Sequence, residues 1–181
     1  MAQEIESRGV FGIRREDMIL VTGATGFVGL ALIARLAREG VETRACVRRD
    51  YVAMPQGVEK LRVGSLAADT DWSRALVGGR VMVHAAARVH IMEDRVSDPL
   101  AEFRRVNVRG SLNLARQAAA AGMQRFVFIS SIKVNGEGTK SGRPFSADDI
   151  AAPLDPYGIS KMEAEQGLQE IAAQTGMEVV I

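Results

Sequence analysis

MILVTGATGFVG, residues 18–29, joins a short apolar run to three glycines, with two residues between each glycine and the next. A buried strand, a glycine turn and a helix form the context that a dinucleotide-binding motif needs. Gly23 allows the tight turn, Gly26 lets the backbone approach a pyrophosphate, and Gly29 lets the helix pack on the strand. The phosphates then face a helix N-terminus, which favours negative charge. A plain glycine-rich turn is the alternative.

Beyond this stretch, apolar β-type runs alternate with helical ones. We expect strands over 18–22, 42–47, 59–63, 81–84, 125–130 and 178–181, and helices over 27–39, 71–77, 99–121 and 157–175. Such alternation favours an α/β fold, a doubly wound parallel sheet with helices on both faces. Ligands of such sheets bind at the carboxyl ends of the strands. The longest irregular region, 132–156, is rich in Gly, Asp, Ser and Pro and is expected to be functional or mobile.

Length and composition narrow the function classes. The chain has 181 residues, 47% of them hydrophobic and 25% charged, which predicts one globular domain over residues 18–181 after a flexible extension over 1–17. A net charge of +1 favours neither nucleic acid nor an anionic membrane as partner. Residues 1–17 lack the apolar core of a signal peptide, and no apolar run is long enough to cross a bilayer. We therefore expect a cytoplasmic protein.

Metal and disulfide chemistry find little support in the sequence. Cys46 is the only cysteine, which excludes an internal disulfide and a cysteine-based zinc site. His84 and His90 are too few for a His-rich metal site. We expect His84 to be packed at the end of its strand and His90 to be exposed in a loop.

The residues after the second strand select the cofactor. A carboxylate there would bind the ribose 2′-hydroxyl of NAD, but the strand runs into Arg48 and Arg49 with no acid before Asp50. Guanidinium groups offer forked donors to a 2′-phosphate. We therefore expect NADP to be preferred over NAD, with Arg48 as its main contact. Two solvated surface arginines are the alternative.

Tyr157 and Lys161 are spaced for proton transfer. At four residues apart on a helix they share one face, and a nearby ammonium favours the phenolate form of a tyrosine. Ser130 and Ser131 close the fifth strand at its carboxyl end, where a hydroxyl could hold a substrate oxygen. The glycine turn and this constellation together indicate hydride transfer on an alcohol or ketone.

At this point the chain resembles a known family, the extended short-chain dehydrogenases/reductases, also called NAD-dependent epimerases/dehydratases. The resemblance spans residues 18–181 and implies a Rossmann fold. Within the family, the chain is most similar to bacterial nucleotide-sugar 4-epimerases and 4-keto-sugar reductases. It rests on five segments, which are Thr22–Gly29, His84–Ala87, Asn107–Leu114, Phe128–Ser131 and Pro156–Lys161.

The resemblance implies a role for each matching residue. Tyr157 would be the acid/base, Lys161 its pKa-lowering and ribose-binding partner, and Ser131 the catalytic hydroxyl, with Ser130 as runner-up. Asn107 would brace the neighbouring backbone. The implied cofactor-binding residues are Gly23, Thr25, Gly26, Phe27, Val28, Gly29, Arg48, Ser65, Leu66, Ala85, Ala86, Ala87, Asn107, Tyr157 and Lys161.

Three departures from the family pattern matter. The 4,6-dehydratases carry an acid pair where this chain has Ile132 and Lys133, so dehydration is not expected. Ser65 stands where the family often has an aspartate that contacts adenine. The C-terminal substrate domain is missing, and we expect the natural polypeptide to continue past Ile181.

The sequence thus predicts oxidoreduction or epimerisation at C4 of a UDP-sugar. The resemblance also implies a possible homodimer through the two long helices. A non-catalytic dinucleotide sensor or scaffold on the same fold is the alternative. Such a protein would be free to lose Tyr157 and Lys161, which this chain retains.

Overall fold

The computed structural model describes residues 17–89, 97–139 and 141–181. Six parallel strands form one sheet in the order β3-β2-β1-β4-β5-β6. The order reverses between β1 and β4, so the crevice where doubly wound sheets bind ligands opens at their carboxyl ends. The expected doubly wound fold is confirmed.

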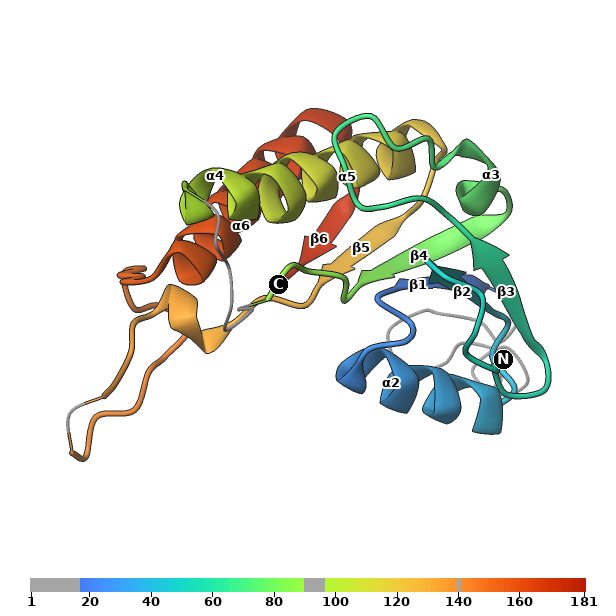
Figure 1. Ribbon diagram of the computed structural model, residues 1–181, viewed down its shortest axis with the longest axis horizontal. Coiled ribbons are helices and arrows are strands. Elements are labelled where there is room, and N and C mark those ends of the chain that lie inside the picture. Colours follow the sequence, from blue (N-terminus) through green and yellow to red (C-terminus); the bar gives the residue numbers. More distant parts are fainter. Residues whose placement is uncertain (1–16, 90–96, 140) are drawn as a thin grey trace, which may run out of the picture.

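Figure 1 shows α2 on one face of the sheet and the remaining α-helices on the other. The strands are β1 (Met18–Thr22), β2 (Thr43–Val47), β3 (Val58–Arg62), β4 (Gly79–His84), β5 (Arg125–Phe128) and β6 (Glu178–Val180). The helices are α2 (Phe27–Arg38), α3 (Ser73–Leu76), α4 (Pro99–Phe103), η1 (Arg104–Gly110), α5 (Ser111–Ala120), η2 (Ile132–Val134) and α6 (Pro156–Thr175).

The two faces have separate cores. Met82, Phe126 and Phe128 alternate along β4 and β5 and are buried under α5 and α6. On the other face Val21 and Ile33 join β1 to α2. The alternation of side chains along each strand assigns these residues to opposite faces.

The expected helix over 99–121 is continuous but not uniform. Its middle segment, η1, is a π-helix, flanked by α4 and α5. A π segment widens the turn by one residue, and such segments are frequent at functional sites. The helical spacing of apolar residues predicted the length of this element and not its altered turn.

Other boundaries differ modestly from expectation. β5 ends at Phe128, so Ser130 and Ser131 lie beyond the strand rather than in it. The irregular region contains the 3-10 turn η2, whose first backbone groups Ser131 caps. Asp17 is buried and pairs with Arg80 at 3.2 Å, so the folded part includes this residue. The rest of the expected extension, 1–16, and His90 lie outside the described residues.

Candidate functional site

The β1–α2 turn is shaped by its glycines. Gly23 has a φ of 67°, and a Cβ added to it would lie 2.6 Å from the backbone of Ala85 and Ala86. A Cβ on Gly29 would lie 2.1 Å from the Gly23 carbonyl oxygen. Only glycine fits at either position, so the turn passes close to the β4 terminus while α2 packs tightly behind it.

A hollow of about 490 Å³ opens at the carboxyl ends of β1, β2, β3 and β4. Nine of the expected cofactor-binding residues line it, and they come from four separate segments. These nine are Gly23, Thr25, Gly26, Arg48, Ser65, Leu66, Ala85, Ala86 and Ala87. The parallel sheet therefore gathers residues that are far apart in the sequence beside the N-terminus of α2.

The six other expected cofactor contacts do not line this hollow. Phe27 and Val28 point to solvent, with 94% and 47% of their surface exposed, and Gly29 packs against the turn. Asn107 is buried in η1 and Lys161 in α6. Tyr157, on α6, lies outside the hollow as well.

A second hollow lies beside the first, at the ends of β2 and β3. Arg48, Arg49 and Arg62 line it together with Ser65. Asp50, the first acid after β2, pairs with Lys60 at 2.5 Å. Three arginines thus line this space, and the first carboxylate after β2 is paired with a lysine.

His84 closes the sheet beneath the site as a neutral side chain. Its Nδ1 lies 2.6 Å from Thr22 Oγ1 and its Nε2 lies 2.8 Å from Ser111 Oγ. Burial first, and then the charge of Lys161, lowers the pKa of His84 to about 3. Its packing beside Phe128 agrees with the structural role expected from the sequence.

Asn107 braces the backbone beside the hollow, as the sequence predicted. Its side-chain oxygen accepts from Arg88 N at 2.7 Å, and its Nδ2 donates to Arg88 O and Ser160 Oγ, both at 3.0 Å. Ser160 in turn donates to Tyr157 O at 2.7 Å. This chain of bonds ties the hollow to the first turn of α6.

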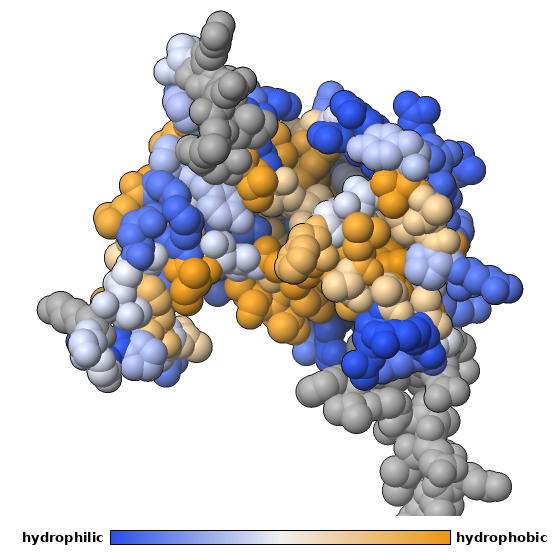
Figure 2. Space-filling view, turned by 60° about the horizontal axis from the view of Figure 1, so that its bottom comes forward, coloured by the Kyte–Doolittle hydropathy of each residue, from blue (hydrophilic) through white to orange (hydrophobic). Residues whose placement is uncertain are grey.

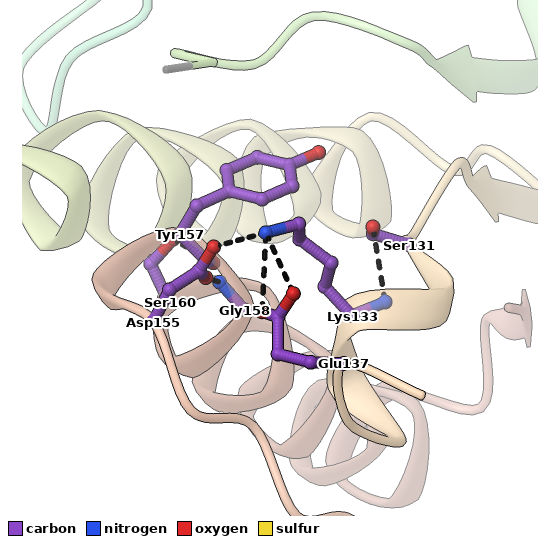
Figure 3. A network of polar contacts seen from close by, with 7 residues as sticks. All are labelled: Ser131, Lys133, Glu137, Asp155, Tyr157, Gly158 and Ser160. Atoms are coloured by element: carbon purple, nitrogen blue, oxygen red, sulfur yellow. Dashed lines mark hydrogen bonds and ion pairs between the residues drawn. The ribbon is translucent and has the colours of Figure 1, made fainter. Parts of the chain in front are cut away.

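Tyr157, in the first turn of α6, and Ser131, at the start of η2, lie in elements that pack against each other. Figure 3 shows the two side chains near one another, beside Lys133 and Asp155. The pKa of Tyr157 is raised, mainly because the phenol is partly buried. The Ser131 side chain and the Lys133 charge lower this pKa, and the Asp155 charge raises it. The phenol therefore holds its proton at neutral pH.

The sequence led us to expect that Lys161 lowers the pKa of Tyr157, but the pKa is raised and Lys161 is not among the groups that shift it. Lys161 Nζ donates to Ile129 O at 2.7 Å and lies 3.6 Å from the centre of the Phe128 ring. Burial lowers the pKa of Lys161 itself to about 8, and the Glu165 charge opposes that shift. The ammonium thus faces β5 rather than the phenol oxygen.

Ser130 and Ser131 are separated by their partners. The Ser130 hydroxyl donates to the Glu165 carboxylate on α6. Ser131 accepts from Lys133 N at 3.3 Å and lies near the Tyr157 side chain (Figure 3). The assignment of Ser131 rather than Ser130 as the catalytic hydroxyl stays a prediction.

Sequence reasoning did not assign a role to several residues that shape the site. Arg88, Arg105 and Val106 line the hollow, while Ser160, Glu165 and Asp155 hold the site residues in place. Ser160 stands three residues after Tyr157 in the sequence, but its hydrogen-bond partner Asn107 is 53 residues away. No local pattern marks such a pair.

Two searches of the described part of the chain gave no further site. Within residues 17–89, 97–139 and 141–181, no group of three or more His, Cys, Asp or Glu side chains is arranged to hold a metal ion. In the same ranges, every helix is too short or too polar for a bilayer span.

Comparisons with known proteins agree with this geometry. Residues 19–181 match the model of the NAD dependent epimerase/dehydratase family. A UDP-glucose 4-epimerase of Vibrio cholerae is 46% identical over 171 residues, covering 90% of this chain and 49% of the relative.

Solved structures show the same fold. A short-chain dehydrogenase/reductase superfamily protein from Agrobacterium tumefaciens with bound NAD is 34% identical, with a TM-score of 0.77 over 91% of this chain and 48% of that one. MoeE5 in complex with UDP-glucuronic acid and NAD is 30% identical, with a TM-score of 0.74 over 89% and 51%. The chain spans about half the length of these relatives.

Proposed function

Because the chain belongs to the NAD dependent epimerase/dehydratase family, we propose that it serves hydride transfer at C4 of a UDP-sugar, as a 4-epimerase or a 4-ketoreductase. The proximity of the Ser131 hydroxyl to the Tyr157 phenol (Figure 3) carries this proposal, because it brings a proton donor and a polarising group to the same part of the site. Both lie at the sheet edge where ligands of doubly wound folds bind.

The residues present fit a dinucleotide. The turn at Gly23 and Gly29 leaves room that any Cβ would fill, and the N-terminus of α2 offers free N–H groups to a pyrophosphate. The hollow is lined on the β4 side by small side chains, those of Ala85, Ala86 and Ala87. Bound there, the dinucleotide would supply or accept the hydride.

The chain itself would manage the proton. In the reducing direction Tyr157 donates its phenolic proton to the sugar 4-oxygen while the Ser131 hydroxyl polarises that oxygen. The raised pKa of Tyr157 keeps the phenol protonated before reaction, which suits donation. Lys161, whose pKa is lowered to about 8, would offer its remaining N–H donors to cofactor ribose hydroxyls.

We propose that NADP is preferred. The hollow formed by Arg48, Arg49 and Arg62 suits a 2′-phosphate, and the pairing of Asp50 with Lys60 leaves that carboxylate engaged. The two solved neighbours named above contain NAD, so a direct comparison is needed. Fluorescence titration should give a lower Kd for NADPH than for NADH, and Arg48→Ala should remove the difference. Equal or tighter NADH binding in the unaltered chain would contradict the preference.

Turnover tests the reaction. Epimerase activity would convert UDP-glucose to UDP-galactose without net loss of reduced cofactor, whereas a reductase would consume one NAD(P)H for each UDP-4-keto sugar. Tyr157→Phe should slow either reaction by a factor of about 10²–10⁴, while the chain still binds the dinucleotide. A variant that keeps full biological function without turnover would favour the sensor alternative.

We also propose that dehydration of the hexose is absent. Ile132 is 64% exposed and carries no acid or base, and the Lys133 ammonium is paired with Asp155 and Glu137. Incubation with UDP-glucose and NAD should yield no 4-keto-6-deoxy product.

We further propose a homodimer through the long helices. α5 and α6 pack together on one side of the sheet, and their neighbours α4 and η1 continue the same ridge (Figure 1). Light scattering over a range of concentrations should give twice the monomer mass, and a constant monomer mass would contradict this assembly.

A further inference from the structure

One ion pair joins the turn that carries Ser131 to the helix that carries Tyr157. Lys133 Nζ lies 2.5 Å from Asp155 Oδ2 and 3.1 Å from Glu137 Oε1. Figure 3 shows the Lys133 side chain reaching between the two carboxylates, beneath the phenol ring. The two segments are distant in the chain, so this contact is a tertiary bridge within the site.

Each residue of the bridge makes a second hydrogen bond, Lys133 through its backbone N–H and Asp155 through its other carboxylate oxygen. Lys133 N donates to Ser131 Oγ at 3.3 Å, and Asp155 Oδ1 accepts from Gly158 N at 2.6 Å as the cap of α6. A Cβ on Gly158 would lie 2.7 Å from Lys133 O, so the backbones themselves are closely apposed. Lys133 and Asp155 therefore connect the backbone beside Ser131 to the first turn of α6.

The bridge contributes little to global stability. The Lys133 and Asp155 side chains are 40% and 32% exposed. Ion pairs with this much solvent access contribute little to folding, because water and salt screen them. The consequence of the pair must therefore be sought in the geometry and electrostatics of the site.

We propose that Lys133 is a positioning residue of the reaction proposed above, which sets the placement of the Ser131 hydroxyl against the Tyr157 phenol through its bridge to Asp155. The proposal rests on the proposed function for its catalytic consequence. The ion pair between Lys133 and Asp155 is independent of the proposed function, because the structure gives its contacts directly.

The charges around Tyr157 make the bridge measurable. Lys161 lies on α6 and Asp155 caps that helix, while Lys133 lies in η2 and Glu137 follows η2. The Phe103 ring of α4 and the Tyr157 ring pack edge to face, and the Arg88 guanidinium lies over the Phe103 ring. Among these, the Asp155 charge raises the pKa of Tyr157 and the Lys133 charge lowers it. Removal of one charge or the other should therefore move the phenol titration in opposite directions.

The test uses the two tyrosines of the chain. Tyr51 is 77% exposed and lies away from the bridge after β2, so it serves as an internal reference for Tyr157. Biosynthetic 3-fluorotyrosine gives each a ¹⁹F signal whose shift follows ionisation. The variants are Lys133→Met, Lys133→Arg, Asp155→Asn and Glu137→Gln, and asparagine keeps the capping oxygen of Asp155.

We expect the Tyr157 titration to move to higher pH in Lys133→Met and to lower pH in Asp155→Asn. It should stay in place in Lys133→Arg and in the control Glu137→Gln, and Tyr51 should be unmoved in all four. An unmoved Tyr157 in Lys133→Met, or shifts of the same sign in Lys133→Met and Asp155→Asn, would overturn the proposal.

Kinetics supply the second readout. Lys133→Met should lower kcat by about tenfold or more with a smaller change in KM, because misplacement of reacting groups acts on the chemical step. Lys133→Arg should restore most of this loss, and an unrescued arginine variant would argue against a role for the charge. Because the phenol titration needs no turnover, inactivity of the unaltered chain on every UDP-sugar would refute the proposed reaction alone.

Discussion

Gly29 is the residue at which the first turn of α2 crosses the β1–α2 turn. A Cβ there would lie 2.1 Å from Gly23 O, a separation that forces the backbone to move. We expect Gly29→Ala to lower the free energy of unfolding by about 1–3 kcal/mol, as other overpacking substitutions do, and to weaken dinucleotide binding. Urea unfolding and fluorescence titration measure the two effects.

Gly138→Ala is the matched control for this substitution. An added Cβ at Gly138 meets nothing within 4 Å. Its unfolding free energy should change by no more than about 0.5 kcal/mol. Equal stability of the two variants would show that the crossing tolerates a side chain.

His84 links folding to pH. Its pKa is about 3 in the folded chain against 6.5 for a free histidine, so between these values the unfolded chain takes up a proton that the folded chain refuses. The unfolding free energy contributed by this group is constant above pH 6.5 and falls as the pH decreases towards 3, by up to about 1.4 kcal/mol per pH unit. Urea unfolding at pH 7.5, 6 and 5 should show a shallower decline in His84→Gln. Parallel declines would contradict the assignment.

At the scale of elements, the π-helical segment η1 carries the buried side chain of Asn107. The π turn holds this side chain inward, 1% exposed, where it bonds both backbone groups of Arg88 and the Ser160 hydroxyl. Asn107→Ala leaves these groups without the amide, which costs about 1–3 kcal/mol for each that stays buried and unsatisfied. We expect a lower urea midpoint and weaker dinucleotide binding.

Thr175→Ala separates these two effects. Its hydroxyl donates to Ile171 O at 2.7 Å at the far end of α6, so its loss should affect stability without affecting dinucleotide affinity. If Asn107→Ala also left the affinity unchanged, the brace would be structural only.

Elements were predictable where their signal is local. Apolar runs and glycine stops marked all six strands and the four main helical segments, because burial of one face imposes a period on neighbouring residues. The π turn left no such mark, since Phe103, Asn107, Gly110 and Leu114 keep a helical spacing whether or not one turn is widened. The widened turn is seen only in the folded backbone of residues 104–110.

The candidate site divides in the same way. The resemblance to the family implied the nine residues that line the hollow, and they come together because strand ends converge in a parallel sheet. The charges around Tyr157 were not, because Lys133 and Asp155 are paired only by tertiary packing. Helical spacing placed Lys161 one turn from Tyr157, yet its ammonium bonds to Ile129 O.

At the scale of the whole molecule, the two faces of the sheet are covered unequally. In the described residues, α2 is the single α-helix on its face, while α4, α5 and α6 cover the other (Figure 1). Val83, Val127 and Val180 are paired in register across β4, β5 and β6, and this row points to the α2 side. Figure 2 looks onto that side and shows hydrophobic residues gathered across its middle.

This row predicts a measurable property of the chain. Strands of a parallel sheet are normally buried on both faces, yet Val180 is 41% exposed. We expect the chain to enhance ANS fluorescence, and Val180→Thr to reduce the enhancement because it replaces a methyl group by a hydroxyl while retaining a β-branched side chain. Val77→Thr is the matched control, since Val77 is 67% exposed after α3, away from this face. Equal ANS signals from the two variants would place the dye elsewhere, whereas a loss confined to Val180→Thr would identify the open sheet face as its site.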